Sequence, residues 1–374
     1  MAADKKGKKL PTGIRKKSEN SYEVRVKHDG KTYYEYASTI TEAKKKRVDL
    51  KYQLTHGTYI KPATYTFDEW FNFWIKNYKE NSVKIGTIQT YKNYYNSCVK
   101  ERFGNVKIDK IKGADIQAFY NDLAKKGRKL STIKVVKAFM SSCLKQAVKD
   151  ELIARNPFDA TSLPRKIGER QARMAMTREE QDIFMEYAKE SFLYNLFAVM
   201  LRTGMRSGEA RDLRWSDIDK KQNVIHVTRT LQYINGVGFI DDAPKTKTSV
   251  RDIPLTMEVL KLLESQKNYW GFKVEKIDRY LFCDLDGNPI NVHLLQAEID
   301  RTIKRIHEDG KEFPRITSHV FRHTFATRAI EAGMQPQVLK TIMGHSSLAM
   351  TMDLYSHVLP DTKAEEMQKI ANVF

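Results

Sequence analysis

The stretch SHVFRHTFAT, residues 318–327, is followed by GHSS at 344–347 and by TMDLYSHV at 351–358. These three segments supply a His-x-x-Arg pair, a further histidine and a tyrosine. Upstream of them, TGMRSGEARDLRW at 203–215 adds an arginine, and PKTKTSVRDIPL at 244–255 adds lysines. Because these side chains together suit the chemistry of a phosphate ester, we expect one folded unit to bring the five segments together.

A phosphodiester under attack gains negative charge on its non-bridging oxygens, and preorganised cations stabilise that charge. Arginine binds phosphate bidentately and stays charged, which makes Arg206 and Arg322 the candidates for this role. A tyrosine nucleophile keeps the bond energy in a phosphotyrosyl linkage, so Tyr355 would need no metal, ATP or other cofactor. His319 and His345 are candidates to accept the tyrosine proton and to hydrogen-bond the phosphoryl oxygens.

Each of these residues has a simpler interpretation when it is considered alone. Arg206 precedes Glu209 near the start of a helix, so a structural ion pair is the alternative. A His-x-x-Arg pair is common by chance, and Tyr355 also fits a half-buried aromatic residue. The prediction of an active site therefore depends on all of the segments together.

The net charge of +19, from 65 lysines and arginines against 46 aspartates and glutamates, indicates a polyanionic partner. Basic side chains neutralise phosphates and release counterions, so double-stranded DNA is the expected partner. Residues 1–62 hold 16 of the basic residues and only 7 of the acidic ones. This first part is therefore the most basic region of the chain.

Other features narrow the class of protein. The cysteines form no Cys-x-x-Cys pair, so neither a zinc site nor a disulfide framework is expected. No apolar run approaches the ~20 residues that span a bilayer, and the N-terminal MAADKKGKKL lacks the apolar part of a signal peptide. We therefore expect a cytoplasmic protein, associated with the nucleoid and without a membrane partner.

Residues 1–62 are predicted to form a DNA-binding domain with a basic tail, three strands and a helix. Asp29-Gly30 lies between alternating segments and predicts a hairpin turn. Thr39-Ile40-Thr41-Glu42 is a capping box, which predicts a helix over roughly 40–55. Such a sheet suggests insertion of strands into the major groove, with a merely solvated basic face as the alternative. The candidate DNA contacts are Arg15, Lys16, Arg25 and Lys27.

Residues 63–160 are predicted to form an all-helical DNA-binding domain. A second capping box at Thr66-Phe67-Asp68-Glu69 opens it, and further helices are expected at roughly 85–102, 113–126 and 131–150. Aromatic residues at helical spacing predict core rather than a base-stacking surface; they are Phe67, Trp70, Phe71, Trp74 and Tyr78. The candidate DNA contacts here are Lys92, Lys134 and Lys137.

Residues 161–176 are polar and basic without an apolar period, which predicts a linker. A third capping box, Thr177-Arg178-Glu179-Glu180, opens the last domain at 177–374. Strands are predicted there in NVIHVTRT (223–230), GFIDD (238–242) and RDIPL (251–255). The chain is therefore expected to be a multidomain protein, mainly α-helical, with small β-sheets.

These segments give the chain a resemblance to the tyrosine recombinases. TGMRSGEA followed by LRWSDID is similar to the first box of that family, HVFRHTFAT to its His-x-x-Arg box, and MGHSSLAMTMDLYSHV to the box with the nucleophile. The helical part resembles the family's core-site-binding domain. The N-terminal part is similar to the arm-binding domain of integrases from conjugative transposons and temperate phages.

The resemblance implies a role for each candidate residue. The nucleophile would be Tyr355, the phosphate clamps Arg206 and Arg322, the general base His319 and the phosphate-binding histidine His345. The family's general acid is a lysine on a β-hairpin between the first two boxes.

Two lysines fit the position of that general acid. Lys245 is favoured because it precedes the threonine, as in the lambda integrase pattern. Lys247 is the alternative, or else a contact to the DNA backbone. Two further polar residues near the motifs, His323 and Glu209, are expected to be structural.

The implied reaction is integration and excision of a mobile element by a homotetramer on core and arm sites. Protomers cleave one strand each to give 3′-phosphotyrosyl ends, and the free 5′-hydroxyls attack the partner duplex to form a Holliday junction. The tail at 361–374 is predicted to be an amphipathic helix that docks on a neighbouring protomer, with packing on its own protomer as the alternative. An excisionase and a host DNA-bending protein are further partners implied.

Three other functions use parts of this pattern. A type IB topoisomerase has the same cations but no use for an arm-binding module, and a Xer-type resolvase generally lacks the basic N-terminal sheet. A non-catalytic DNA-binding regulator has no reason to keep the nucleophile. The N-terminal part thus favours an integrase of a phage or a conjugative transposon, with residues 13–55 favouring the transposon.

Overall fold

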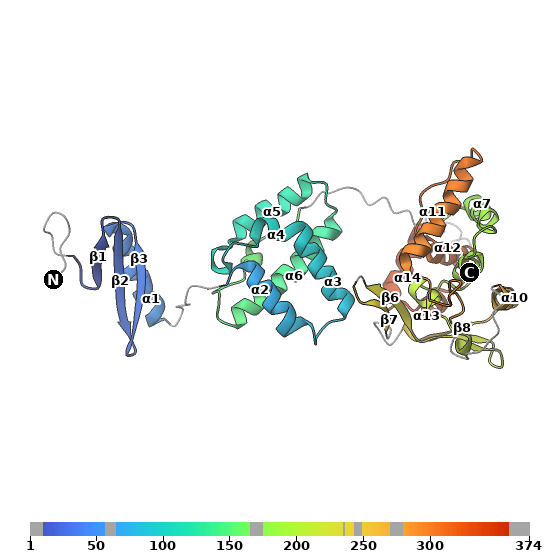
Figure 1. Cartoon of the computed structure of the whole chain (residues 1–374), viewed down its shortest axis with the longest axis horizontal. Helices are drawn as coiled ribbons and strands as arrows, with labels where there is room; N and C mark the ends of the chain where they lie inside the picture. The colour runs from blue at the N-terminus through green and yellow to red at the C-terminus, as the bar shows by residue number, and fades with distance from the viewer. Residues whose placement is uncertain are drawn as a thin grey trace, which may run out of the picture. The chain divides into compact units, whose positions relative to one another are not determined.

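The computed structural model describes residues 10–56, 65–164, 175–234, 236–242, 249–269 and 280–358. The chain divides into two compact units, Met1–Glu169 and Arg170–Phe374. The first unit contains a small sheet with one helix and a group of helices, and the second contains the remaining helices and strands (Figure 1). No helix among these residues is long and apolar enough to cross a membrane.

The N-terminal sheet consists of β1 (Ile14–Ser18), β2 (Ser21–His28) and β3 (Lys31–Ala37), paired antiparallel in that order. Asp29 and Gly30 both have positive φ angles, of 46° and 75°. This is the type I′ turn geometry that matches the twist of a two-residue hairpin. The predicted hairpin is confirmed.

Helix α1 (Ile40–Thr55) covers one face of this sheet and has the predicted bounds. The Thr39 hydroxyl accepts a hydrogen bond from the Glu42 amide at 3.2 Å, as expected for a capping box. The Glu42 carboxylate instead accepts from the amide and hydroxyl of Ser38, at 2.9 and 2.8 Å. The second half of the predicted box is therefore wrong, because Ser38 offers two donors. The core between sheet and helix consists of Ile14, Val24, Ala37 and Ala43.

The rest of the first unit is a group of helices. They are α2 (Phe67–Trp74), η1 (Ile75–Lys79), α3 (Ile85–Tyr94), η2 (Tyr95–Val99), α4 (Lys100–Phe103), η3 (Ile108–Lys110), α5 (Gly113–Lys125), α6 (Leu130–Lys149) and η4 (Pro157–Ala160). The three helices predicted after α2 are confirmed, the first with a π-helical turn inside it.

The aromatic stripe of α2 forms the core of this group. Its fully buried members are Phe67, Trp70, Phe71 and Trp74. Tyr78 departs from the prediction, since it is 37% exposed and donates a hydrogen bond to Asp150 at 2.7 Å. It lies in the π-helical turn η1, which rotates residues away from an α-helical stripe. The capping box that starts α2, between Thr66 and Glu69, is confirmed.

The second unit contains the remaining helices. They are α7 (Arg178–Ala188), α8 (Tyr194–Thr203), α9 (Ser207–Arg211), η5 (Trp215–Asp217), α10 (Met257–Asn268), α11 (Val292–Glu308), α12 (Ser318–Glu331), α13 (Pro336–Met343) and α14 (Leu348–Val358). The capping box of Thr177 and Glu180 opens α7 as predicted.

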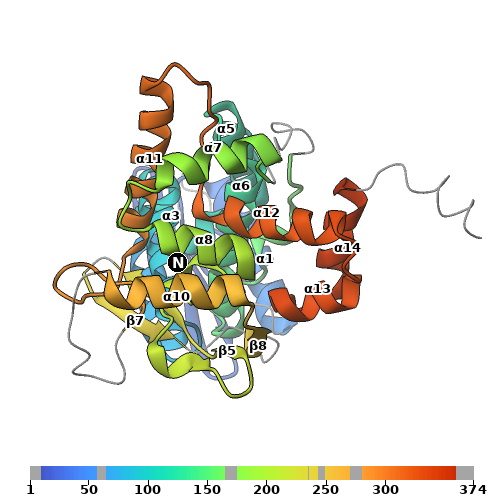
Figure 2. The same cartoon turned by 90° about the vertical axis from the view of Figure 1, so that its right-hand side faces the viewer.

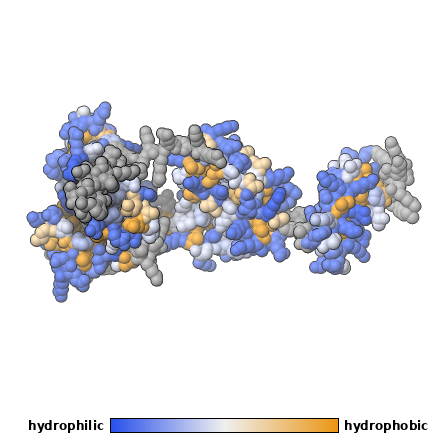
Figure 3. Space-filling view, turned by 180° about the vertical axis from the view of Figure 1, so that it is seen from behind, coloured by the Kyte–Doolittle hydropathy of each residue, from blue (hydrophilic) through white to orange (hydrophobic). Residues whose placement is uncertain are grey.

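Helix α8 is the central element of the second unit. It is buried along most of its length and packs against α7, α10 and α12. Helix α12 in turn contacts α13 and α14, which lie beside each other (Figure 2). Phe197 of α8 stacks on Phe321 of α12, with ring centroids 5.4 Å apart. The surface drawn in Figure 3 is mostly hydrophilic, with small apolar patches.

The strands of the second unit form two small sheets. One has the order β4-β5-β8, from Ile218–Asp219, Val224–Val227 and Arg251–Pro254, and the other pairs β6 (Thr230–Ile234) with β7 (Gly238–Asp242). The predicted strand at 223–230 is thus split between two sheets. In the described strands β7 pairs with β6 and β8 pairs with β5, and the residues around Lys245 between β7 and β8 lie outside the described part of the chain.

Candidate active site

Three arginines converge on the C-terminal end of helix α13. The carbonyls of three consecutive residues each accept a hydrogen bond from a different arginine. The pairs are Arg251 with Ile342 at 2.5 Å, Arg322 with Met343 at 2.6 Å, and Arg206 with Gly344 at 3.0 Å. Carbonyls at a helix C-terminus lack intrahelical partners and carry the negative end of the helix dipole. The helix end therefore holds three like charges close together, and we call them the arginine cluster.

The carboxylate of Glu209 joins two members of the arginine cluster. It accepts hydrogen bonds from the Arg206 and Arg251 guanidinium groups, both at 2.8 Å, and from the Arg206 amide at 2.9 Å. Burial favours the neutral acid, but the hydrogen bonds and charges of Arg251 and Arg206 hold the pKa of Glu209 below its usual value. The ion pair considered for Arg206 is thus present. Arg206 still keeps 34% of its side chain exposed, which leaves it accessible to a ligand.

Arg322 is the more enclosed of the two predicted phosphate ligands. It donates a second hydrogen bond to the carbonyl of Gly204, at 2.7 Å, at the point where α8 ends. Gly204 has a φ of +63°, and a Cβ there would lie 2.3 Å from the Phe325 ring, so only glycine fits. Burial, then the charge of Arg206, lowers the pKa of Arg322 to about 9, which leaves it cationic at neutral pH.

His345 directly follows the carbonyls that hold the arginine cluster. Its Nδ1 atom lies 2.9 Å from the hydroxyl oxygen of Thr351, and both side chains are buried. Burial lowers the pKa of His345 to about 4, and Arg322, Arg206 and Arg251 add to this effect. The imidazole is therefore neutral at pH 7.

Two more histidines lie on helix α12. His319 is exposed in its first turn, while Arg322, one turn later, is buried. His323 is half-buried, and burial followed by the charges of His319 and Arg322 lowers its pKa. It also contributes to the lowered pKa of His345. His323 therefore lies within electrostatic reach of these residues, although its place beside Arg322 in the sequence predicts a side chain that points away from them.

Tyr355 lies on α14, outside the arginine cluster. Its ring packs in a small core with residues of α12 and α13, and its hydroxyl donates a hydrogen bond to the carbonyl of Met334. Burial raises the pKa of Tyr355. Tyr355 therefore lies in the same compact unit as the arginine cluster, with its hydroxyl hydrogen-bonded to Met334.

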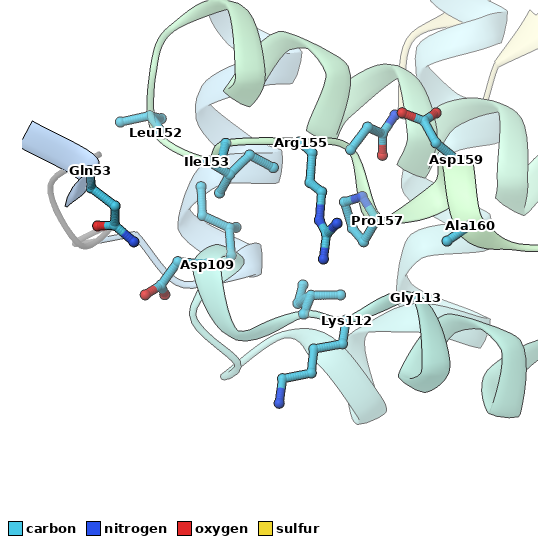
Figure 4. Close-up of a pocket in the computed structure, with 14 residues that line it drawn as sticks. Gln53, Asp109, Lys112, Gly113, Leu152, Ile153, Arg155, Pro157, Asp159 and Ala160 are labelled. Carbon is cyan, nitrogen blue, oxygen red and sulfur yellow. The ribbon is translucent and has the colours of Figure 1, made fainter. Parts of the chain in front are cut away.

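Both candidates for the general acid, Lys245 and Lys247, lie outside the described residues, as does the tail at 361–374. The described residues contain no group of three or more side chains that could hold a metal ion. A surface pocket on the helical group is lined by Asp109, Lys112, Arg155 and Asp159 among others (Figure 4). Because its charges are of mixed sign, it offers no single field for a phosphate.

Candidate DNA contacts of the N-terminal sheet lie mainly on the face opposite α1. Arg15, Arg25 and Lys27 are exposed on that face, and Arg25 pairs across the sheet with Tyr34, which is 50% exposed. Lys16, two residues after Ile14 on the same strand, lies on the helix-covered face of the sheet and is partly buried.

In the helical group, α3 and α6 pack together through Tyr91 and Phe139, whose ring centroids are 5.5 Å apart. Lys92 on α3 and Lys134 on α6 are exposed, and Lys137 is partly exposed. All three lysines are therefore accessible, Lys92 on α3 and both Lys134 and Lys137 on α6.

The structure adds Arg251 and Thr351 to the residues predicted from the sequence. Arg251 lies in RDIPL, which the sequence pattern indicates only as a strand. Its position four residues after the candidate Lys247 is the feature of the sequence that could have marked it as a site residue. Thr351 lies one helical turn before Tyr355, and that spacing is its only signal in the sequence.

An arginine cluster in the same compact unit as a helix-borne tyrosine, in a strongly basic chain, has the chemistry expected of a DNA strand transferase. Residues 174–361 match the phage integrase family, and residues 66–124 match the phage integrase N-terminal SAM-like domain. The first match spans half of the chain, so the chain belongs to the phage integrase family.

Several curated relatives are tyrosine recombinases or integrases. The chain is 26% identical over 364 residues to a XerC-like tyrosine recombinase of Caldanaerobacter subterraneus subsp. tengcongensis, with 91% of each chain covered. It is 27% identical over 351 residues to the ICEBs1 integrase of Bacillus subtilis, covering 89% of this chain and 90% of the relative. The chain is therefore a tyrosine recombinase of the transposon or phage integrase type, an enzyme that cleaves and rejoins DNA strands.

Solved structures agree with this assignment. The Tn1549 transposon integrase in complex with transposon right end DNA has a TM-score of 0.71 and 27% identity, with 82% of this chain and all of that chain covered. A lambda integrase tetramer bound to a Holliday junction shares the fold, with a TM-score of 0.60 at 18% identity over 93% of this chain and 95% of that one. The predicted fold class, multidomain and mainly helical with small sheets, is confirmed.

Proposed function

We propose that the chain integrates and excises a mobile DNA element through a phosphotyrosyl intermediate formed at the arginine cluster. One observation carries the proposal: three arginines are fixed on consecutive carbonyls at residues 342–344, next to His345. Such preorganised donors need no rearrangement when charge develops on a phosphate.

Arg206 and Arg322 are the proposed phosphate ligands. Each uses two of its five N–H donors on protein oxygens, so three remain for the non-bridging oxygens. His345 adds a hydrogen bond to the same oxygens. His319, exposed at the start of α12, would accept the proton of the tyrosine.

Tyr355 is the proposed nucleophile. Its oxygen attacks phosphorus, the bond from phosphorus to the 5′-oxygen breaks, and the proton of the phenol passes to His319. Lys245, or alternatively Lys247, would give a proton to the departing 5′-oxygen. Attack of a 5′-hydroxyl from the partner duplex reverses these steps and releases the tyrosine, so no external energy source is consumed.

The N-terminal sheet is the proposed arm-site-binding module, contained in a domain over residues 1–62. Its open face carries three exposed cations and Tyr34, which suits contact with a DNA groove. The domains at 63–160 and 177–374 would hold the core site, joined by the linker at 161–176. We further propose a homotetramer on DNA at the nucleoid, assisted by an excisionase and a host DNA-bending protein, with the tail at 361–374 docked on a neighbouring protomer.

A Xer-type resolvase is the second candidate function, because the XerC-like relative aligns over 91% of both chains. A substrate with two core sites and no flanking arm sites separates the candidates. A resolvase would recombine it, whereas an arm-binding integrase would require the flanking sites.

Covalent trapping tests the proposed chemistry. Protein is mixed, without metal or ATP, with a nicked duplex that carries the junction of its own element, and the products are separated on a denaturing gel. We expect a protein–DNA adduct from the natural enzyme and none from Tyr355→Phe. Specific binding without an adduct would contradict the proposed mechanism.

A further inference from the structure

The hydroxyl of Thr351 is buried and has one hydrogen-bond partner among the residues that the structure describes. Its oxygen lies 2.9 Å from Nδ1 of His345, and Thr351 is fully buried. Within the described part of the chain, neither side chain has another hydrogen-bond partner. Threonine in a helix often donates to the carbonyl four residues earlier, but Thr351 does not.

This isolation determines the direction of the hydrogen bond. A buried hydroxyl proton needs an acceptor, and Nδ1 is the acceptor within reach among the described residues. If Thr351 donates, Nδ1 is unprotonated. The proton of a neutral imidazole then lies on Nε2.

The tautomer matters because of where His345 lies. It follows Gly344, whose carbonyl binds Arg206, and three arginines act on its ring. A neutral histidine can stabilise a phosphoryl oxygen only through an N–H group. The other tautomer would present a lone pair at Nε2 and repel that oxygen.

We propose that Thr351 is a positioning residue that fixes His345 as the Nε2–H tautomer and aims this donor at the scissile phosphate. The inference rests on the proposed function and adds to it the position of the proton on the His345 ring. Thr351 also lies one helical turn before Tyr355 on α14, so the same hydrogen bond ties the helix of the nucleophile to the arginine cluster.

Two substitutions of nearly unchanged size isolate the hydroxyl. Thr351→Val keeps the branched shape and loses the donor, whereas Thr351→Ser keeps the donor and loses a methyl group. We expect the cleavage rate at saturating DNA to fall roughly ten- to a hundredfold in Thr351→Val, with unchanged DNA affinity, and to be largely restored in Thr351→Ser. Thr341→Val removes a hydroxyl that bonds only within α13, and should leave the rate unchanged.

A double-mutant cycle separates positioning from packing. If Thr351 acts through His345, Thr351→Val should cause no additional loss in a His345→Ala background. Full additivity, or equal losses in Thr351→Val and Thr351→Ser, would overturn the inference. An adduct formed by Tyr355→Phe would instead contradict the proposed function, so the two failures are distinguishable.

Nitrogen-15 NMR of the histidine rings tests the tautomer without any reaction. The His345 signals, assigned by their loss in His345→Gln, should show a protonated Nε2 and an unprotonated Nδ1 at neutral pH. Thr351→Val should give a mixture of tautomers. A natural enzyme with the proton on Nδ1 would overturn the inference even if cleavage depends on Thr351.

Discussion

The hydroxyl of Tyr355 is hydrogen-bonded to the main-chain carbonyl of Met334, in the turn between α12 and α13. If Tyr355 is the nucleophile, as proposed, the proton that leaves during attack is directed at this backbone carbonyl in the structure, and burial raises the pKa of the phenol. Attack by the proposed nucleophile therefore requires that its hydrogen bond to Met334 is broken.

Tyr355→Phe removes both the nucleophile and this hydrogen bond. We expect unchanged DNA affinity, no covalent adduct and a loss of about 0.5–1.5 kcal/mol in the free energy of unfolding. Trapping gels and urea titration measure the two effects. Tyr187→Phe is the control, since Tyr187 also donates its hydroxyl, to Asp309, but far from the motifs in sequence. An adduct from Tyr355→Phe would exclude this residue as the nucleophile.

Glu209→Gln should weaken the arginine cluster. The substitution leaves Arg251 buried without its anion, which costs roughly 3–5 kcal/mol of unfolding free energy, and it also lowers the cleavage rate. The pKa of Glu209 is lowered on folding, so its stabilisation is complete above the unfolded pKa and is lost as pH falls through the folded pKa. The difference between the two proteins should therefore shrink in acid.

Urea titrations of Glu209→Gln from pH 3 to pH 7 measure this difference. Glu264→Gln, which removes an exposed partner of Lys220, should change stability by at most about 1 kcal/mol. Equal effects of the two substitutions would show that the buried carboxylate has no special role.

Asp212→Asn should remove a pH dependence of stability. Asp212 is 2% exposed, and neither carboxylate oxygen has a hydrogen-bond partner among the described residues. Burial, then the charge of Asp241, raises the pKa of Asp212 from its usual value of 3.8 to about 7, with Arg229 and Arg214 opposing the shift. The folded state thus binds the proton more tightly, and stability declines as pH rises from about 4 to about 7.

The decline is at most about 4 kcal/mol, since each pKa unit corresponds to about 1.4 kcal/mol. Asp212→Asn should show a flatter profile and be more stable than the natural chain at pH 8. Urea unfolding at pH 5 and pH 8 measures both. Parallel profiles would show that Asp212 ionises normally in the folded state.

The open face of the N-terminal sheet should control the salt dependence of DNA binding. Removing one neutralised phosphate from the interface reduces the slope of log K against log salt by about 0.9. We expect a flatter slope after deletion of residues 1–62 and a smaller change in Arg25→Ala combined with Lys27→Ala. Lys16→Ala, on the helix-covered face, is the control. An unchanged slope after the deletion would contradict the arm-binding role.

Local sequence signals predicted the elements well. The Asp29-Gly30 turn and the capping boxes at Thr66 and Thr177 depend on residues within four positions of each other, and the structure has all three. The motif order also led to the family that the comparisons confirm. Such signals depend on spacing alone, so they can be recognised without the tertiary fold.

The site's finer geometry could not be predicted in this way. Arg251 owes its position to Ile342, which is 91 residues away, and Tyr355 owes its position to Met334. The directions of these side chains depend on how α13 and α14 pack, and no local pattern encodes that packing. The predicted strand at 223–230 is divided between two sheets for the same reason, since strand partners are chosen by the tertiary fold.

The carbonyls at residues 342–344 come late in the order of synthesis. The arginines at 206, 251 and 322 all leave the ribosome before the helix end that binds them. The growing polypeptide therefore carries the three guanidinium groups before the carbonyls that hold them together exist. Like charges without a common acceptor repel each other. A chain truncated before residue 342 would therefore keep the basic residues that bind DNA but would lack the carbonyls that hold the arginine cluster together.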